Sequence, residues 1–473
     1  MIKDIFTKYS KNDFIIGHKG LKLSYGQFWE SSLSYAKKLE LSGCREGDFV
    51  IIKLENCVEY LKLYIACILK GLVACPLDPK ILDHRYKKLL ADINPKLVID
   101  NIETLNNVND DKKINEFSIK NSDFDCIMLQ SSGTTSSVKG ILHTSKSLIN
   151  SAISFSRISG ITQKTVVYHH FPMFYMAGVF NMFLCPLVSG SKIVLGQRFS
   201  KNQMFSFWET PVKFGVNNLT LTPTMAMALA KLHKNHKSKN YISNIEQIVS
   251  TSSYLHKSVY DEFEKIFSNV LQTCYGVTEV GGSITYTSKN DAVRFNYDTG
   301  SYGKEIKFKY KGSKKDPVEI IIKTPFMMSG YFRNGKKVSG LRNGYFHTGD
   351  IGYVKNGKLF LTGRKSDMIK KGGEFISLNE IEDTLLKSNI VEEMCVLGID
   401  DNFWSNKILV FFTHRDGKNF EEIKENLINF GLKYLSEIEM PDEFIHVNSF
   451  PKTSIGKIKK NELIKFYDDR KSK

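Results

Sequence analysis

Apolar and polar segments alternate along the first hundred residues in a way that predicts strands and helices in turn. Apolar runs of strand length occupy 48–54, 73–77 and 97–100, and segments of helix length lie between them at 56–72 and 81–94. The order strand, helix, strand, helix, strand is typical of a doubly wound parallel sheet. No Gly-x-Gly-x-x-Gly follows any of these strands, which argues against a dinucleotide-binding fold.

The rest of the chain predicts a second α/β region and then a smaller unit of different character. The strand and helix pattern returns at 166–180, 191–195 and 218–232. In the last hundred residues, a basic, glycine-containing loop is followed by short amphipathic segments at 379–388, 408–413 and 420–434. A chain of 473 residues exceeds the roughly 250–300 residues that one hydrophobic core organises. We therefore expect a large unit and a small α+β unit, joined by a short linker near Arg364 to Ser366.

One long segment, 165–191, contains no Asp, Glu, Lys or Arg. Its length would suffice to cross a bilayer, which needs about 20 apolar residues. However, His169, His170, Pro172 and Pro186 lie inside it, and such residues are costly in lipid. The sequence therefore favours a buried loop and core helix over the alternative, a membrane segment.

Composition narrows the class of protein. Hydrophobic residues make up 42% of the chain and charged residues 25%, which excludes disordered, collagenous and miniature disulfide proteins. The net charge is +16, but only 10 of the 66 basic residues are Arg, so we interpret it as a field that attracts anions and predict no nucleic-acid partner. The eight cysteines form no Cys-x-x-Cys pair, and no long apolar run follows the first charges. We expect reduced thiols and a cytoplasmic location.

Four segments contain residues suited to chemistry on phosphates. The hydroxyl-rich loop 131–140 nearly matches a Walker loop, but Val138 stands where the second Gly should be. Tyr-Gly-Val-Thr-Glu at 275–279 combines an aromatic face, a hydroxyl and a carboxylate suited to Mg²⁺. The acidic and basic residues of 346–352 and 363–367 could together hold a ribose and its phosphate, and 451–460 is a basic loop. Taken singly, each segment is compatible with an ordinary turn or a solvated surface.

In this order, the four segments resemble those of the adenylate-forming superfamily of AMP-binding enzymes. The superfamily includes acyl- and aryl-CoA synthetases, the adenylation domains of peptide synthetases, and luciferases. The resemblance runs from Leu23-Ser24-Tyr25 to Lys457, over nearly the whole chain. It implies an N-terminal AMP-binding and acyl-pocket domain, residues 1–364, built of stacked, partly parallel sheets with helices. It also implies a small, mobile α+β C-terminal domain, residues 365–473, that carries the catalytic lysine.

The resemblance also implies a role for individual residues. In the ATP site it places Ser132, Thr134, Thr135 and Lys139 on the phosphates, Ser252 and Ser253 near the adenine, Tyr275 with Gly276 on the adenine face, and Asp350 with Arg364 on the ribose. The catalytic residues would be Thr278 at the α-phosphate, Glu279 as the Mg²⁺ ligand, and Lys457 between the carboxylate and the α-phosphate. Phe174, Tyr175 and Gly178 would line the acyl pocket, Gly372 and Gly373 the pantetheine path, and Ser366 would be the hinge.

Three departures from the family pattern concern loops. Ser136 and Val138 replace the usual Gly and Pro of the phosphate loop, and Ser366 occupies a hinge position that is commonly Asp or Lys. The segment 251–255, Thr-Ser-Ser-Tyr-Leu, stands where Gly-Gly-Ala-Pro-Leu is usual. These changes spare the charged residues, so we expect them to alter loop mobility and turnover more than the type of reaction. A slow or inactive nucleotide-binding relative remains the alternative.

The resemblance implies an ATP-dependent acid-thiol ligase. Such an enzyme uses ATP and Mg²⁺ to form an acyl-adenylate, and then a thioester with CoA or a carrier-protein phosphopantetheine. Since 165–191 contains no Asp to hold an α-amine, we expect an uncharged acyl or aryl carboxylate as the small-molecule substrate. The alternatives are an enzyme activating amino or other acids for a carrier protein, a luciferase-like oxygenase, and a polyanion-binding protein without catalysis. A homodimer is possible.

Overall fold

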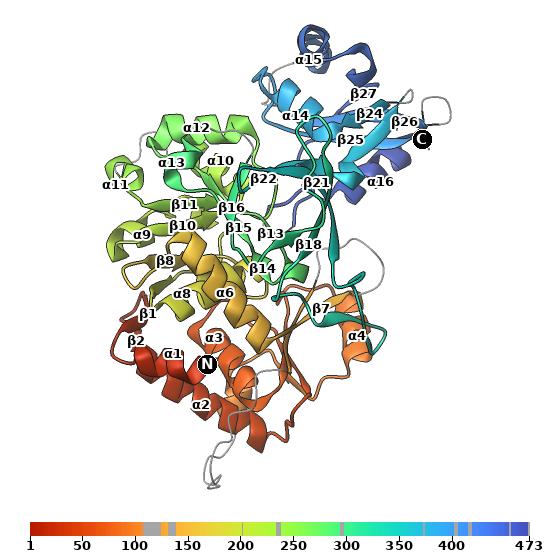
Figure 1. Ribbon diagram of the computed structural model, residues 1–473. Coiled ribbons are helices and arrows are strands. Elements are labelled where there is room, and N and C mark those ends of the chain that lie inside the picture. The colour runs from red at the N-terminus through yellow and green to blue at the C-terminus, as the bar shows by residue number, and fades with distance from the viewer. Residues whose placement is uncertain are drawn as a thin grey trace.

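A large N-terminal body and a small C-terminal body make up the molecule (Figure 1). The computed structural model describes residues 1–106, 124–130, 139–200, 202–232, 238–293, 298–371, 374–401, 405–414, 419–453 and 456–471. The small body, drawn in blue, lies against one end of the large body, close to α12 (Lys257–Phe267), β21 (Phe346–Lys355) and β22 (Lys358–Arg364).

The first sheet of the large body contains the elements predicted for the first hundred residues. Its strand order in the described residues is β20-β19-β7-β6-β4-β3-β5. The strands are β3 (Phe49–Ile52), β4 (Val73–Pro76), β5 (Leu97–Ile99), β6 (Asp125–Gln130), β7 (Gly140–Thr144), β19 (Gly330–Arg333) and β20 (Lys336–Val338). Strands β3 to β6 are parallel, and α3 (Val58–Lys70) and α4 (Asp83–Ile93) connect the first three of them. The predicted helices and strands are confirmed, and β7 and β19 then extend the sheet in antiparallel fashion.

The second sheet is parallel except at one edge, where β2 turns back along β1. Its order in the described residues is β12-β11-β10-β8-β9-β1-β2. The strands are β1 (Asp13–Gly17), β2 (Lys22–Ser24), β8 (Val166–His169), β9 (Lys192–Leu195), β10 (Asn218–Leu221), β11 (Gln247–Ser250) and β12 (Gln272–Thr273). The helices along it are α9 (Glu209–Phe214), α10 (Pro223–Leu232), α11 (Lys239–Ser243) and α12, with a 3₁₀ turn at η2 (Asn202–Met204). Trp208 and Phe263 are fully buried in its core.

The uncharged run 165–191 is buried in the large body. It forms β8, then α7 (Met176–Val179), a π-helical turn η1 (Phe180–Leu184) and α8 (Cys185–Ser189). Phe180 and Phe183 are fully inaccessible, and α6 (Ser145–Ser159) packs against this helical segment. The buried loop and core helix are therefore confirmed. None of the helices in the described residues combines the length and the hydropathy needed to cross a bilayer.

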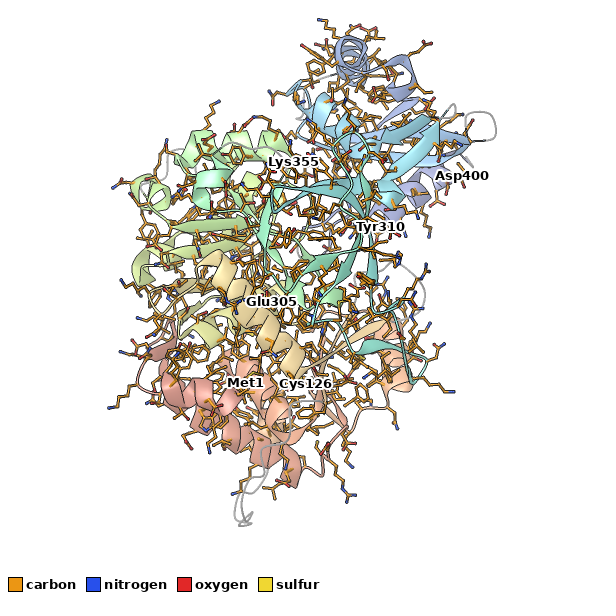
Figure 2. All side chains as sticks on the ribbon, viewed as in Figure 1. Met1, Cys126, Glu305, Tyr310, Lys355 and Asp400 are labelled. Atoms are coloured by element: carbon orange, nitrogen blue, oxygen red, sulfur yellow. The ribbon has the colours of Figure 1, made fainter. Side chains whose placement is uncertain are left out.

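A third, antiparallel sheet links the large body to the small one. Its order in the described residues is β15-β16-β22-β21-β18-β17. Besides β21 and β22 it comprises β15 (Thr285–Tyr286), β16 (Asp298–Tyr302), β17 (Lys307–Phe308) and β18 (Val318–Lys323). A short ribbon of β13 (Gly276–Val277) and β14 (Gly282–Ser283), joined by the turn η3 (Thr278–Val280), precedes it, and α13 (Lys289–Ala292) follows β15. Glu305, in the loop before β17 (Figure 2), accepts a 3.0 Å hydrogen bond from Arg157 and so ties this loop to α6.

Three further helices complete the large body. They are α1 (Ile2–Lys8), α2 (Tyr25–Leu41) and α5 (Glu103–Asn106). Helix α2 begins at a capping box, in which the Ser24 hydroxyl and the Gln27 side chain each bond the other residue's backbone N–H. Its Tyr25 and Phe28 are fully buried against Phe6 and Phe14, so the start of the chain is part of the core.

The C-terminal body is a small α+β unit, as predicted. Its elements are η4 (Lys365–Asp367), β23 (Met368–Lys371), β24 (Glu374–Ser377), α14 (Leu378–Leu386), β25 (Glu393–Asp401), β26 (Ser405–Thr413), α15 (Phe420–Tyr434), η5 (Glu437–Glu439), β27 (Glu443–His446) and α16 (Lys460–Lys471). β26 pairs antiparallel with β25 and parallel with β27. The predicted segments coincide with α14, β26 and α15. The fold class is thereby confirmed, whereas the boundary between 364 and 365, which falls between β22 and η4, stays a prediction.

Candidate active site

Tyr275, Asp350 and Arg364 form a hydrogen-bonded cluster at the edge of the third sheet. The Tyr275 hydroxyl donates to Asp350 Oδ2 at 2.6 Å, and Arg364 Nε donates to Asp350 Oδ1 at the same distance. Only 4% of Asp350 is exposed, so these two donors stabilise a carboxylate that has little contact with water. Burial, followed by the charge of Asp350, raises the pKa of Tyr275 well above its ordinary value, and the phenol stays a donor.

The local sequence explains this geometry. Asp350 and Arg364 are direct partners in the antiparallel register of β21 and β22, which places both side chains at one end of the hairpin. Tyr275 precedes the β13–β14 ribbon, in which Gly276 faces Ser283. A Cβ on Gly276 would lie 1.9 Å from the Gly282 carbonyl oxygen, so only glycine allows the two strands to approach this closely.

Lys457 reaches this cluster from the C-terminal domain. Burial lowers its pKa, and the charge of Arg364 lowers it further while that of Asp350 raises it, so all three side chains lie within electrostatic reach. The loop that carries Lys457 is closed on itself, because Lys457 N donates to Thr453 Oγ1 at 3.1 Å and Thr453 N donates to the Lys457 carbonyl at 2.8 Å. Thr224 of α10 donates to the Gly456 carbonyl at 3.1 Å and thereby binds the loop to the large domain.

Lys139 and Glu279 lie together at a second, adjoining cluster. Lys139 Nζ is 3.8 Å from Glu279 Oε1 and 3.6 Å from the centre of the Tyr331 ring. The Tyr331 hydroxyl donates to the same Glu279 oxygen at 3.0 Å. The neighbouring turn is fixed by His143, whose Nε2 donates to the Thr278 carbonyl at 2.7 Å. Burial lowers the pKa of His143 to about 4, so its ring is neutral at pH 7 and serves as a donor.

Of the predicted acyl-pocket residues, Tyr175 lies close enough to Arg364 to feel its charge. Phe174 and Tyr175 are half-buried. Burial raises the pKa of Tyr175, and a hydrogen bond with Ser252 and the charge of Arg364 oppose this rise. Gly178 is buried, and a Cβ there would lie 2.2 Å from the Pro172 carbonyl oxygen. Ser252 has a backbone φ of 74°, in the left-handed region, at a position where relatives with Gly-Gly would carry glycine. Asn181 Nδ2 donates to Ser283 Oγ at 3.2 Å on the wall formed by η1.

Some predicted residues lie outside this arrangement. Ser132, Thr134, Thr135, Ser136, Val138, Gly372 and Gly373 lie outside the described residues. Ser253 is exposed, and Ser366 is exposed in η4, where its hydroxyl contacts Asp367 at 3.4 Å. The structure brings Tyr275, Asp350, Arg364 and Lys457 together, and it places Lys139 beside Glu279. The assigned roles themselves stay predictions.

Sequence reasoning missed a second contact between the two domains. His256, at the N-terminus of α12, has its Nδ1 2.5 Å from Asp383 Oδ1 and its Nε2 3.1 Å from Glu382 Oε1. Tyr254 donates to Asp383 Oδ2 at 2.9 Å. These residues are more than 120 positions apart and match no local motif, so no signal in the sequence could have paired them. Tyr331 was also missed, because it lies in an ordinary strand pattern.

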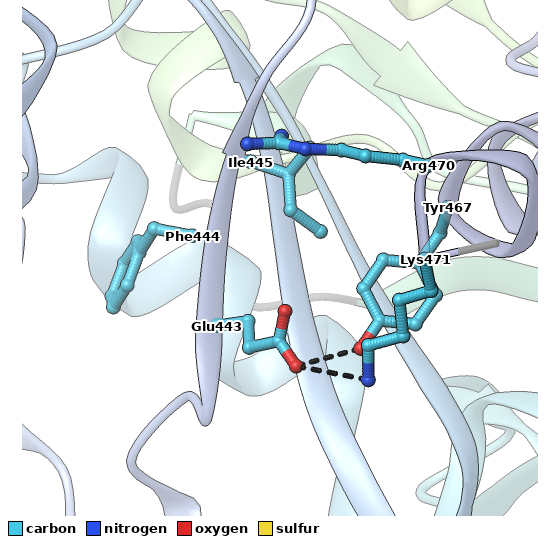
Figure 3. Close-up of a pocket in the computed structure, with 6 residues that line it drawn as sticks. All are labelled: Glu443, Phe444, Ile445, Tyr467, Arg470 and Lys471. Atoms are coloured by element: carbon cyan, nitrogen blue, oxygen red, sulfur yellow. Dashed lines mark hydrogen bonds and ion pairs between the residues drawn. The ribbon is translucent and has the colours of Figure 1, made fainter. Parts of the chain in front are cut away.

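A shallow pocket in the C-terminal domain is distinct from these clusters (Figure 3). It is lined by Glu443, Phe444, Ile445, Tyr467, Arg470 and Lys471. Tyr467 donates to Glu443 at 2.6 Å and Lys471 lies 3.4 Å from the same carboxylate. Glu443, Tyr467 and Lys471 therefore satisfy one another.

Comparison with known proteins identifies the family. The AMP-binding enzyme family matches residues 5–332, and the C-terminal domain of AMP-binding enzymes matches residues 380–457. The chain belongs to the AMP-binding enzyme family. It is 26% identical over 469 residues to the 2-succinylbenzoate–CoA ligase of Oceanobacillus iheyensis, covering 94% of each chain. It is 25% identical to the oxalate–CoA ligase of Arabidopsis thaliana, with 89% of this chain and 88% of the relative covered.

Solved structures share the whole fold. The ATP-bound MatB of Rhodopseudomonas palustris superposes with a TM-score of 0.88 over 99% of this chain and 98% of that protein, at 21% identity. The o-succinylbenzoate CoA synthetase of Bacillus subtilis, in complex with its acyl-adenylate, gives a TM-score of 0.83 over 98% and 97% of the two chains, at 23% identity. The predicted family, fold and ligase class are confirmed.

Proposed function

We propose that this protein activates a carboxylic acid with ATP and transfers the acyl group to the thiol of CoA. The observation that carries the proposal is the position of Lys457. Thr224 of the large domain bonds the Gly456 carbonyl at 3.1 Å and so holds the next residue, Lys457, against that domain. There the charges of Asp350 and Arg364, two residues that suit a ribose, act on the lysine. Docking of the small domain therefore adds a cation at the place where two anionic reactants would have to meet.

The nucleotide would lie along the Tyr275 and Asp350 cluster. Asp350 accepts the ribose hydroxyls, since its two oxygens have further lone pairs beyond those used by Tyr275 and Arg364. Tyr275 presents its ring to the adenine, with Ser252, Ser253 and Gly276 nearby in sequence or space. Ser132, Thr134, Thr135 and Lys139 would hold the β- and γ-phosphates, and Thr278 the α-phosphate.

Glu279 is the residue that fits a Mg²⁺ ion. The described residues contain no group of three or more His, Cys, Asp or Glu side chains that could hold a metal. A single carboxylate nevertheless suits Mg²⁺ bound to a nucleotide, because this ion usually takes one or two carboxylates together with phosphates and water. When bound, Mg²⁺ would neutralise phosphate charge.

In the first half-reaction an oxygen of the substrate carboxylate attacks the α-phosphorus, and pyrophosphate leaves. Both reactants are anions, so the chain contributes mainly position and positive charge. Lys457 would contact the attacking carboxylate and the α-phosphate together, while Lys139 stays with the departing pyrophosphate. In the second half-reaction the thiolate sulfur of CoA attacks the acyl carbonyl carbon, and AMP leaves.

For the acid we propose an uncharged acyl or aryl carboxylate. The helical segment beside the site has no charged side chain between residues 165 and 191. The neighbouring Arg198 stacks 5.1 Å from the Phe174 ring, but both of its terminal nitrogens bond Asp78, at 3.2 and 3.4 Å. Its charge is therefore already matched, and it offers little to a second carboxylate on the substrate.

The alternative substrate class is a dicarboxylate, because the names of the relatives specify 2-succinylbenzoate and oxalate. For the acceptor, the relatives support CoA, whereas a carrier protein would need a docking surface for a second macromolecule. The domain boundary after Arg364, the hinge at Ser366 and the pantetheine path at Gly372 and Gly373 belong to this proposal, since the small domain would have to rotate to admit the thiol.

The test is acid-dependent exchange of labelled pyrophosphate into ATP across a panel of carboxylic acids. The panel includes aliphatic and aryl monocarboxylates, malonate, oxalate, 2-succinylbenzoate and amino acids. We expect exchange with a monocarboxylate, followed by thioester formation when CoA is added. Exchange confined to dicarboxylates or amino acids would overturn the substrate class, and the absence of exchange with every acid would overturn the activity.

A further inference from the structure

We propose that Tyr331 is a positioning residue that holds Lys139 and Glu279 apart and in place for the ATP phosphates and the metal. The inference rests on the proposed function, since it gives both charged residues a ligand. The side chain of Tyr331 contacts the two residues by different means. Its hydroxyl donates to Glu279 Oε1 at 3.0 Å, and its ring face lies 3.6 Å below the Lys139 ammonium.

The distances indicate why a third side chain is needed. Lys139 Nζ and Glu279 Oε1 are 3.8 Å apart, which is longer than a charge-assisted hydrogen bond of about 2.8 Å. A lysine and a carboxylate so close together, partly shielded from water, would otherwise be expected to close into a direct pair. The Tyr331 hydroxyl already occupies the Glu279 oxygen nearest the lysine, and the ring face attracts the ammonium toward itself.

This arrangement leaves binding capacity on both charged residues. Every described hydrogen bond or ion pair of the Glu279 side chain goes to Oε1, so Oε2 is available to a metal. The Lys139 ammonium contacts a ring on one side and keeps N–H donors for phosphate oxygens on the other. A direct Lys139–Glu279 pair would have to be broken before ATP could bind.

The pairing of β19 with β7 fixes the position of the Tyr331 ring. Tyr331 of β19 pairs with Ile141 of β7, two residues beyond Lys139. The ring is therefore held beside Lys139, and only 7% of the residue is exposed. Glu279 is fixed from its own backbone as well, because its carbonyl accepts a 2.9 Å hydrogen bond from Met328 N, three residues before Tyr331.

The experiment compares Tyr331→Phe, Tyr331→Leu and the control Tyr353→Phe. Tyr353 is also 7% exposed and stacks on Phe360 in β22, away from both charged residues. Tyr331→Phe keeps the ring under Lys139 and removes only the hydroxyl. We expect it to raise the Mg²⁺ concentration for half-maximal pyrophosphate exchange by about tenfold, with the rate at saturating Mg²⁺ within about twofold of wild type.

Tyr331→Leu removes the ring as well. We expect it to raise the KM for ATP by a further factor of about three to ten, because the cation–π contact with Lys139 at 3.6 Å is lost together with the longer one to Arg333 at 5.3 Å. If Tyr331 had only a structural role, both variants would be less stable to heat, but the Mg²⁺ concentration for half-maximal exchange would stay at the wild-type value. A wild-type Mg²⁺ midpoint in Tyr331→Phe, or an equal shift in Tyr353→Phe, would overturn the proposal.

A binding measurement separates this proposal from the proposed function. ATP affinity is measured by calorimetry at a series of Mg²⁺ concentrations, without acid or CoA. If wild type binds MgATP but exchanges no pyrophosphate with any acid, the proposed function fails, and the Mg²⁺ dependence of binding by Tyr331→Phe still decides the role of Tyr331. If Mg²⁺ does not strengthen ATP binding by wild type, the role proposed for Tyr331 is overturned, whereas pyrophosphate exchange still decides the proposed function.

Discussion

The His256 ring in the N-terminal domain lies between two carboxylates of the C-terminal domain, with its Nδ1 2.5 Å from Asp383 Oδ1. The second carboxylate, Glu382, also accepts a 2.8 Å hydrogen bond from the Val396 backbone, and Tyr254 donates to Asp383. Burial alone would lower the pKa of His256, but the hydrogen bonds and charges of Asp383 and Glu382 outweigh it and raise the pKa to about 10. Docking of the two domains therefore takes up a proton at pH values between the ordinary pKa of histidine, 6.5, and the raised pKa of about 10.

This contact predicts a pH dependence of domain docking. The folded pKa is raised, from 6.5 to about 10, so the stabilisation is fully present below about pH 6.5 and is lost as the pH rises through 10. His256→Gln should cost roughly 2–4 kcal/mol at pH 6, because it leaves two buried carboxylates without their cation. Thermal unfolding of both proteins between pH 6 and pH 10 should show the difference shrinking with pH. A constant difference would contradict the assignment.

Lys457→Ala should abolish most of the first half-reaction. We expect acid-dependent pyrophosphate exchange to fall by at least about 100-fold, on the scale of other single groups that stabilise a transition state. ATP binding should change little, since the large domain supplies the residues for the nucleotide. Lys459→Ala is the matched control, because this partly exposed lysine pairs with Glu462 at 2.9 Å in the same segment. Near-normal exchange by Lys457→Ala would show that this lysine does not act in adenylation.

Asp350→Asn should weaken ATP binding. The variant keeps the shape of the side chain but removes the charge that holds Arg364 and accepts from Tyr275. We expect the KM for ATP to rise by about 10- to 100-fold, the loss of one or two charge-assisted hydrogen bonds. Tyr275→Phe, which removes one donor and leaves the charge, should have the smaller effect. A larger effect of Tyr275→Phe would mean that the carboxylate is not the main contact.

The site residues that could be predicted from the sequence are those that belong to local motifs. Asp350 and Arg364 belong to two neighbouring motifs, and an antiparallel hairpin then makes them direct partners. Lys457 lies 93 positions beyond Arg364. It could be assigned only through resemblance to a family, because no local pattern indicates which lysine of a basic loop reaches another domain.

The contacts that sequence could not predict depend on tertiary packing. His256 and Asp383 come from different domains. In the sequence, His256 resembles an ordinary residue at a helix terminus, and Asp383 resembles an ordinary residue on a helix surface. In the sequence, Tyr331 is one of several aromatic residues in predicted strands. Only the register of β19 on β7 shows that it lies beside Lys139. The strands and helices could be predicted from the periodicity of apolar residues. The partners of His256 and Tyr331 could not, because they depend on how the sheets and domains pack.

Ser252→Gly should stabilise the protein while loosening the acyl pocket. Ser252 has a φ of 74°, which costs a residue with a Cβ about 1 kcal/mol, and glycine adopts this conformation without that cost. After subtracting the greater flexibility of glycine in the unfolded chain, we expect a gain of roughly 0.5 kcal/mol in the free energy of unfolding.

The same change removes the hydroxyl that bonds the Tyr175 phenol. With Tyr175 less fixed, the range of acids that support pyrophosphate exchange should widen, and the KM for the preferred acid should rise by about two- to fivefold. Ser253→Gly is the control, because Ser253 is exposed and is not among the described residues with positive φ. It should lower stability and leave the acid preference unchanged. If both variants alter stability and acid preference alike, the strain at Ser252 and its contact with Tyr175 have no specific role.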